Sequence, residues 1–244
     1  EYKDLSDVCV QNIKNAGFDC IFTLGGDGTQ KSSRDFSLKG VNCIGVPKTI
    51  DNDVASTDMT FGYNTAVSVA SDALDRLHTT GETHHRIMVL EVMGRYAGWI
   101  ALESAIAGGA DVALIPEIPY DFDRDVIERM KRAQKSNKVH FVIVVSEAIG
   151  GVEEMAKRIQ SETGVEARAT ILGHVQRGGN PTLRDRLRAT QMGYEAVQLL
   201  NKGKGNRVVA YQGSSVVSYE IEEALTITKQ LDQQMLKIAL ETAI

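Results

Sequence analysis

The sequence has 244 residues, 43% of them hydrophobic, which is enough to bury one large core or two smaller ones. Its formal net charge is −5, so we expect neither nucleic acid nor an acidic membrane surface as a partner. No segment is apolar over a membrane-spanning length, and residues 1–4 (EYKD) do not resemble a signal peptide. The three cysteines form no CxxC pair, which indicates reduced thiols and a cytoplasmic location. Because the chain does not begin with methionine, we expect it to start inside a longer protein.

Short apolar runs alternate with longer amphipathic segments along the chain. The runs predict strands at residues 19–24, 41–46, 86–93, 112–115, 140–147 and 207–212. The amphipathic segments predict helices at residues 5–16, 64–78, 97–107, 123–135, 152–162 and 183–200. This alternation predicts an α/β protein with mainly parallel sheets flanked by helices. Glycines at the strand ends place loops where such proteins bind ligands, at the carboxyl edge of a sheet.

The first motif is GGDGT at residues 25–29, directly after an apolar strand. Two glycines let backbone N–H groups approach a phosphate, and a following helix would present its positive N-terminus. Asp27 would then hold Mg²⁺ beside that phosphate, because hard cations prefer carboxylate oxygens. The alternative is an ordinary glycine turn with a capping aspartate, and the same motif also marks NAD kinases and lipid kinases.

The second motif is PKTIDND at residues 47–53, after the next strand. If this loop is extended, Asp51 and Asp53 point to the same side because they lie two residues apart. One carboxylate can then accept a proton while the other orients it or contacts metal. An Asp/Asn-rich turn is the alternative interpretation.

A third motif, EVMGR at residues 91–95, again follows an apolar strand. An arginine behind a strand-end glycine can fold over a ligand phosphate and offset the charge that develops during transfer, although an ordinary surface arginine is the alternative. Further along, Glu147 ends an apolar run, and a His and an Arg lie three residues apart in GHVQRGG at residues 173–179. Several arginines supply the guanidinium groups that capture of a sugar phosphate requires in an acidic protein, namely Arg86, Arg168 and Arg177.

These motifs occur in the order in which the 6-phosphofructokinase family has them, together with TFGYN at residues 60–64, ATILGHVQRGG and the Asp-Arg pair at residues 185–186. The resemblance runs from about residue 18 to beyond residue 217. It implies a two-domain phosphofructokinase-like fold and phosphoryl transfer from ATP to O1 of fructose 6-phosphate in glycolysis, with Mg²⁺. It places the phosphoryl-donor domain at residues 1–62 and 176–227, and the sugar-phosphate domain at residues 63–175 and 228–244. The family opens with a glycine-rich strand and turn that this sequence lacks, so we expect an N-terminal portion to be missing.

The resemblance also implies a role for each matching residue. The catalytic residues would be Asp51, as general base, with Thr49, Asp53 and Arg95. The donor would be bound by Gly26, Asp27, Gly28, Thr29 and Lys48, with Asp27 also binding the metal. The sugar phosphate would be bound by Arg86, Met93, Gly94, Glu147, Arg168, His174 and Arg177. Arg86 and Arg168 would reach the sugar of a neighbouring subunit, which implies a homotetramer or homodimer with shared active sites.

The phosphoryl donor is the point on which the motifs diverge. Within the family, Gly28 is typical of ATP-dependent members, whereas Lys48 is typical of pyrophosphate-dependent ones. We expect ATP, because a side chain at position 28 would block the nucleotide while a lysine at position 48 merely adds a cation. The alternative is a pyrophosphate-dependent fructose-6-phosphate 1-phosphotransferase. More remote alternatives are an NAD-kinase-like or lipid-kinase-like enzyme, which would lack PKTIDND and GHVQRGG, and an inactive regulatory subunit.

Overall fold

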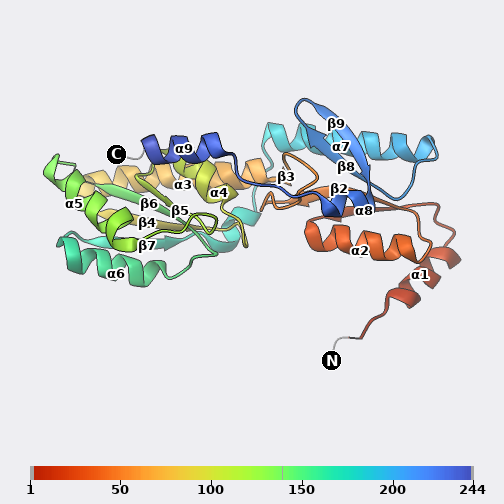
Figure 1. Ribbon diagram of the computed structural model, residues 1–244, viewed down its shortest axis with the longest axis horizontal. Helices are drawn as coiled ribbons and strands as arrows, with labels where there is room; N and C mark the ends of the chain where they lie inside the picture. The colour runs from red at the N-terminus through yellow and green to blue at the C-terminus, as the bar shows by residue number, and fades with distance from the viewer. Residues whose placement is uncertain (1–2, 139, 243–244) are drawn as a thin grey trace. The chain divides into compact units, whose positions relative to one another are not determined.

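The computed structural model describes residues 3–138 and 140–242, which form two compact units (Figure 1). Unit 1 comprises Glu1–Tyr63 and Leu183–Lys229, and unit 2 comprises Asn64–Thr182 and Gln230–Ile244. The domain boundaries expected from the sequence differ slightly, since they assign residues 176–182 to the first domain and residues 63 and 228–229 to the second. Thr182 clusters with unit 2 because it hydrogen-bonds to Asn64 and Thr65. The outermost residues of the expected domains, 1–2 and 243–244, lie outside the described residues.

Unit 1 is built on a sheet of strand order β1-β2-β8-β9, with β3 paired to the end of β2. The β1–β2 and β2–β8 pairs are parallel, and β8 and β9 form an antiparallel hairpin. The strands are β1 (Ile21–Gly25), β2 (Cys43–Thr49), β3 (Phe61–Gly62), β8 (Arg207–Gln212) and β9 (Ser215–Glu220). The helices described in this unit are α1 (Ser6–Asn15), α2 (Asp27–Leu38), α7 (Leu183–Asn201) and α8 (Ile221–Thr226).

Both faces of the unit 1 sheet are covered at β2, because alternate residues of a strand point to opposite faces. Ile44 and Val46 pack in a cluster with residues of α7, whereas Cys43 packs in a cluster with residues of α1 and α8. Figure 1 shows α7 on one side of this sheet and α8 on the other. Burial on both faces explains the apolar run from Cys43 to Pro47, after which the chain becomes exposed at Lys48.

Unit 2 is built on a parallel sheet of strand order β5-β6-β4-β7. Its strands are β4 (Ile87–Val92), β5 (Val112–Leu114), β6 (Phe141–Ser146) and β7 (Ala167–Ile171). The α-helices are α3 (Tyr63–His84), α4 (Trp99–Gly108), α5 (Glu128–Lys135), α6 (Val152–Thr163) and α9 (Gln233–Thr242), with a π-helical turn η1 (Asp123–Ile127) and a 3-10 turn η2 (Gly173–Arg177). Every residue of β6 is buried, since this strand lies inside the sheet under helices.

The structure confirms the α/β class and the mainly parallel sheets expected from the sequence, and five of the six expected strands both begin and end within two residues of the observed bounds. The short β3, the edge strands β7 and β9, and the helices α8 and α9 were not predicted. β7 was not predicted because Arg168 interrupts its apolar pattern. β9 was not predicted because its residues are half-buried and do not alternate clearly between buried and exposed. The antiparallel β8–β9 pair is consistent with the expectation of sheets that are mainly, not wholly, parallel.

Candidate active site

In unit 1, the predicted donor residues and all the predicted catalytic residues except Arg95 gather at one edge of the sheet, which we call the β1–β2 edge (residues 26–29 and 48–53). β1 and β2 run parallel with Gly25 opposite Pro47, so the segments that follow both strands emerge side by side. The glycines permit this closeness. A Cβ on Gly25 would come within 2.2 Å of the Thr29 hydroxyl oxygen, and a Cβ on Gly26 within 3.4 Å of the Thr49 Cβ. The two motifs GGDGT and PKTIDND are therefore neighbours in space.

The start of α2 provides the donor side of the β1–β2 edge. Gly26 is the N-cap residue and Asp27 the first residue of the helix, where backbone N–H groups lack helical partners and favour a negative ligand. The Asp27 carboxylate forms an ion pair with Lys31 (Oδ2–Nζ 2.7 Å) and remains partly exposed. Gly28 is open, since a Cβ built there would meet no atom within 4 Å. Lys48 is exposed at the end of β2.

The side chain of Gln30 supports the ends of β1 and β2, and the sequence did not single this residue out as functional. Its side chain is buried and Nε2 donates to the carbonyl oxygen of Gly25 at 3.0 Å and to that of Val46 at 3.4 Å. Gln30 therefore ties the end of β1 to the end of β2. The sequence shows only a glutamine in the first turn of the helix that follows GGDG, and its burial and partners are visible only in the fold.

Asp51 has one oxygen fixed and the other uncommitted. The Thr49 hydroxyl lies 3.1 Å from Asp51 Oδ2 and donates to it, while the Asp51 backbone N–H donates to the same hydroxyl oxygen at 3.2 Å. Asp51 Oδ1 is buried and accepts no hydrogen bond within the described part of the chain. Buried carboxylate oxygens are normally paired, so this atom is suited to receive a proton or a cation from a ligand.

Asn52 corrects the expected shape of this loop. Its φ of 54° is left-handed rather than extended, so the argument that Asp51 and Asp53 face the same side of an extended chain is wrong. The Asn52 side chain is 2% exposed, and its Oδ1 accepts a hydrogen bond from the Thr60 N–H at 3.0 Å. Asparagine is among the residues that adopt this conformation most readily, which is the turn that the sequence left open as an alternative.

In unit 2, the β4–β6–β7 edge (residues 93–95, 147 and 174–177) collects residues from the carboxyl ends of three adjacent strands. Met93, Gly94 and Arg95 follow β4, and Glu147 follows β6. Glu147 Oε1 accepts hydrogen bonds from the backbone N–H of Gly94 at 3.0 Å and of Arg95 at 2.6 Å. His174 and Arg177 lie in η2 after β7 and are exposed.

The turn at residues 94–95 is conformationally demanding. Gly94 has φ 152°, and a Cβ there would lie 2.5 Å from the carbonyl oxygen of Ala97. Arg95 has φ 58°, a left-handed value that costs a residue other than glycine about 1–2 kcal/mol. The two hydrogen bonds that Glu147 Oε1 accepts from the backbone hold this turn, so Glu147 shapes the backbone around Arg95 as well as lining the edge.

Two side chains behind the same edge, one buried and one partly buried, were not anticipated as functional. Gln176 is 1% exposed, and its Oε1 accepts a hydrogen bond from the Met93 N–H at 2.7 Å, which links η2 to the end of β4. Glu91 lies one residue before the end of β4, and burial, followed by the nearby charge of Glu147, raises the pKa of its carboxyl group. Gln176 was inside the quoted GHVQRGG motif, but its partner is visible only in the fold.

Arg86 and Arg168 lie at the opposite edge of the same sheet. Arg86 immediately precedes β4, and Arg168 pairs in register with Met88 near the start of that strand. Because β4 has six residues, it separates these arginines from Met93 by roughly 20 Å. Both arginines contact Glu166: Arg86 Nε donates to Oε2 at 2.8 Å, and Arg168 forms an ion pair with Oε1. The hydrogen bond from Arg86, with the charge of Arg168, lowers the pKa of the Glu166 carboxyl group.

The described residues fit a magnesium ion held jointly with a phosphate rather than by a cage of side chains. Within residues 3–138 and 140–242, no three His, Cys, Asp or Glu residues group closely enough to hold a metal. Mg²⁺ commonly takes one or two carboxylates, with phosphate oxygens and water supplying the rest. Asp27, at the start of α2, and the unpaired Oδ1 of Asp51 are oxygen ligands of that kind.

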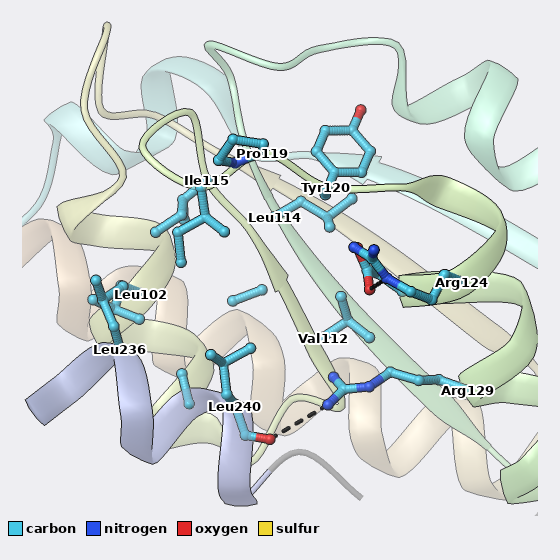
Figure 2. A pocket seen from close by; sticks show the side chains of 14 residues that line it. Leu102, Val112, Leu114, Ile115, Pro119, Tyr120, Arg124, Arg129, Leu236 and Leu240 are labelled. Atoms are coloured by element: carbon cyan, nitrogen blue, oxygen red, sulfur yellow. Dashed lines mark hydrogen bonds and ion pairs between the residues drawn. The ribbon is translucent and has the colours of Figure 1, made fainter. Parts of the chain in front are cut away.

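An apolar pocket in unit 2 contains none of the predicted site residues (Figure 2). It has a volume of about 190 Å³ and lies among α4, β5 and α9, with Leu102, Leu114 and Leu240 in its wall. Arg129 closes one end by donating to the Leu240 carbonyl oxygen at 3.3 Å. The candidate chemistry therefore lies on polar sheet edges, not in this pocket.

Among the helices of the described residues, none has both the length and the apolar character needed to cross a membrane.

Comparison with known proteins gives concordant results. The sequence model of a family described as "Phosphofructokinase" matches residues 1–200. An "ATP-dependent 6-phosphofructokinase 2" of Clostridium perfringens is 47% identical, over 95% of this chain and 70% of that protein. The solved phosphofructokinase of Saccharomyces cerevisiae superposes with a TM-score of 0.82 at 29% identity, over 98% of this chain and 36% of that one. A pyrophosphate-dependent phosphofructokinase from Marinobacter aquaeolei gives a TM-score of 0.87 over 100% of this chain and 72% of that one, and at 21% identity it shows likeness of fold.

Proposed function

The chain belongs to the phosphofructokinase family, and on that premise we propose that the protein transfers a phosphoryl group from ATP to O1 of fructose 6-phosphate. The product would be fructose 1,6-bisphosphate, and the reaction would belong to glycolysis. The relative at 47% identity is named as ATP-dependent, which supports ATP as the donor. The chain spans about 70% of that relative, so the activity is proposed for the full-length protein.

The observation that carries the proposal is the state of the Asp51 carboxylate. Its Oδ2 is held by the Thr49 hydroxyl, while its buried Oδ1 lacks a hydrogen-bond donor within the described residues. A general base needs an accepting atom that is fixed in place and free to take the proton. In the proposed reaction the proton of the sugar 1-hydroxyl passes to Asp51 as the new O–P bond forms and the bond from the γ-phosphorus to the ADP oxygen breaks.

The β1–β2 edge would also receive the donor. Backbone N–H groups at the start of α2 favour phosphate oxygens, and the proposal puts the part of ATP beyond the phosphates over Gly28, where a Cβ would meet no atom within 4 Å. Mg²⁺, when bound, would neutralise charge on the phosphate oxygens, with Asp27 as its proposed ligand. Pyrophosphate remains the second candidate, because the exposed Lys48 adds a cation at the same edge.

The β4–β6–β7 edge would bind the sugar phosphate. Glu147 Oε1 is engaged by the backbone at residues 94–95, so its other oxygen is the one proposed to accept hydrogen bonds from sugar hydroxyls. Arg177 and His174 are exposed at this edge, and a guanidinium is well matched to the 6-phosphate. Arg95 would offset charge on the phosphoryl group in transfer.

Arg86 and Arg168 are proposed to serve a neighbouring subunit. Their position at the far edge of the unit 2 sheet supports this role, because roughly 20 Å of strand separates them from Met93 in the same chain. The protein would then act as a homotetramer or homodimer with shared active sites. We further propose that it works in the cytoplasm.

The test is formation of fructose 1,6-bisphosphate by the full-length protein with ATP and, separately, with pyrophosphate. We expect ATP to be used with the higher kcat/KM. Asp51→Asn keeps the shape of the side chain but removes the basic oxygen, so kcat should fall by about 10²- to 10⁴-fold. The KM for the sugar should change far less. A preference of wild type for pyrophosphate would overturn the donor assignment, and wild-type kcat in Asp51→Asn would overturn the base.

A further inference from the structure

Lys229 reaches the loop that carries the proposed base, although it is 177 residues away in sequence. Its Nζ lies 3.1 Å from the Asn52 carbonyl oxygen, 2.9 Å from Asn52 Oδ1 and 2.8 Å from the Asp58 carbonyl oxygen. An ammonium group has three donors, so one side chain can hold all three oxygens at once. We infer that Lys229 is a positioning residue for residues 51–53.

Lys229 contacts Asn52, and the backbone conformation of Asn52 sets how the carboxylates of Asp51 and Asp53 are directed relative to each other. Asn52 stands between Asp51 and Asp53 and is held in a left-handed conformation with φ 54°. A residue other than glycine returns from this region to the broad right-handed or extended wells unless its surroundings fix it. Because the rotation occurs between the two aspartates, relaxation there would change the direction of Asp51 relative to Asp53 and the residues that follow.

Residues 57–60 of the loop are already fixed to β2 and β8, so Lys229 ties Asn52 to a segment that is itself held. The Tyr211 N–H donates to the Thr57 hydroxyl oxygen at 2.9 Å, and the Asp58 N–H donates to the Tyr211 carbonyl oxygen at 2.8 Å. The Thr60 hydroxyl in turn donates to the Thr49 carbonyl oxygen at 2.8 Å. Loss of Lys229 would therefore loosen residues 51–53 without freeing the segment from 57 to 60.

This inference rests on the proposed function for its catalytic consequence, but the contact itself can be tested without activity. The variant is Lys229→Met, which keeps the length of the side chain and removes its donors. The matched control is Lys202→Met in the same unit, because Lys202 is exposed and lies 3.9 Å from Glu195 in a solvent-accessible pair. Both variants lose one positive charge, so a difference between them reports the contacts of Lys229.

The first readout is amide hydrogen exchange in the full-length protein. The Thr60 N–H donates to Asn52 Oδ1, so its protection should fall by about tenfold or more in Lys229→Met. The Tyr211 N–H, bonded to Thr57, should keep its protection and serves as the internal reference. If Lys229→Met does not fold, Lys229→Gln supplies a second route, since an amide nitrogen has two donors and cannot hold all three oxygens, so Thr60 protection should again fall.

The second readout is the split between kcat and KM for ATP and fructose 6-phosphate. A misplaced base should lower kcat by about 10- to 100-fold with little change in the KM of the sugar, while Lys202→Met behaves as wild type. Unchanged Thr60 exchange in Lys229→Met, or increased exchange with wild-type kcat, would overturn the inference. If wild type itself fails to phosphorylate fructose 6-phosphate, the proposed function fails, and the exchange at Thr60 still decides whether Lys229 holds the loop.

Discussion

Gly28→Asp separates the two possible donors. The position is the second residue of α2, and a Cβ there would meet no atom within 4 Å, so the new side chain displaces nothing in the protein. Aspartate is a somewhat better helix residue than glycine, and a carboxylate in the first turn interacts favourably with the helix dipole by about 0.3–1 kcal/mol. Folding stability should therefore stay the same or rise slightly.

Although Gly28→Asp should not lower folding stability, it should weaken the use of ATP as donor. If ATP lies against the start of α2 as proposed, the added carboxylate occupies its space and repels its phosphates. Loss of one contact to a charged group is worth about 1.5–3 kcal/mol, so kcat/KM for ATP should fall by at least about tenfold. Pyrophosphate extends no further than its second phosphate, so its use should fall less or should rise with Lys48 present.

The assay is kcat/KM for ATP and for pyrophosphate in wild type, Gly28→Asp and Gly28→Asn, with the midpoint of urea unfolding measured in parallel. Asparagine matches aspartate in size but carries no charge, so the Gly28→Asn variant separates the steric effect on kcat/KM from the electrostatic effect. Unchanged kcat/KM for ATP in Gly28→Asp, in a protein as stable as wild type, would refute the placement of the nucleotide over Gly28.

Three further predictions concern assembly, the unit 2 edge and pH. Mixing Arg168→Ala with Asp51→Asn should restore activity after subunit exchange, because hybrid oligomers contain sites free of both defects, and a mixture no more active than its components would argue for sites within one chain. Glu147→Ala should lower the free energy of unfolding by about 1.5–3 kcal/mol more than Glu147→Gln, measured with urea, because only glutamine keeps an acceptor for the two N–H groups of the turn. Burial, with the charge of Cys20 second, raises the pKa of the Cys43 thiol from 9.0 to about 11, so the folded state keeps this proton longer than the unfolded state. Stability should therefore be complete below pH 9 and decline toward pH 11 by up to about 1.4 kcal/mol per pH unit, and a slope unchanged in Cys43→Val would contradict this account.

The parts of the fold that the sequence predicted are those in which local pattern and burial agree. β6 is recognisable because it is buried along its whole length and contains an unbroken apolar run. β7 carries Arg168 on an edge strand, so its pattern does not distinguish it from a loop. The hairpin partner β9 is half-buried and owes its position to pairing with β8, a long-range effect that no window of sequence contains.

The candidate site divides in the same way. Asp51, Glu147 and Arg95 lie in motifs whose order in the chain pointed to them, and their catalytic roles remain predictions. The groups that support them, Gln30 and Lys229, act through partners in other elements. A hydrogen bond across 177 residues leaves no local trace, whereas asparagine in an Asp/Asn-rich segment did allow the left-handed turn at residue 52 as an alternative.

The chain order of the strands has a consequence for synthesis on the ribosome. The four strands of the unit 2 sheet come from one uninterrupted stretch, Ile87 to Ile171, so they can pair as soon as that stretch has emerged. Unit 1 differs, because β2 pairs on one side with β1 and on the other with β8, joining Ile44 to Arg207. Its amino-terminal strands must therefore wait, with one side of β2 open, until the later segment is made. A nascent chain stalled before β8 would expose that side of β2 to other strands, so we expect unit 1 to aggregate more readily than unit 2 when synthesis stops early.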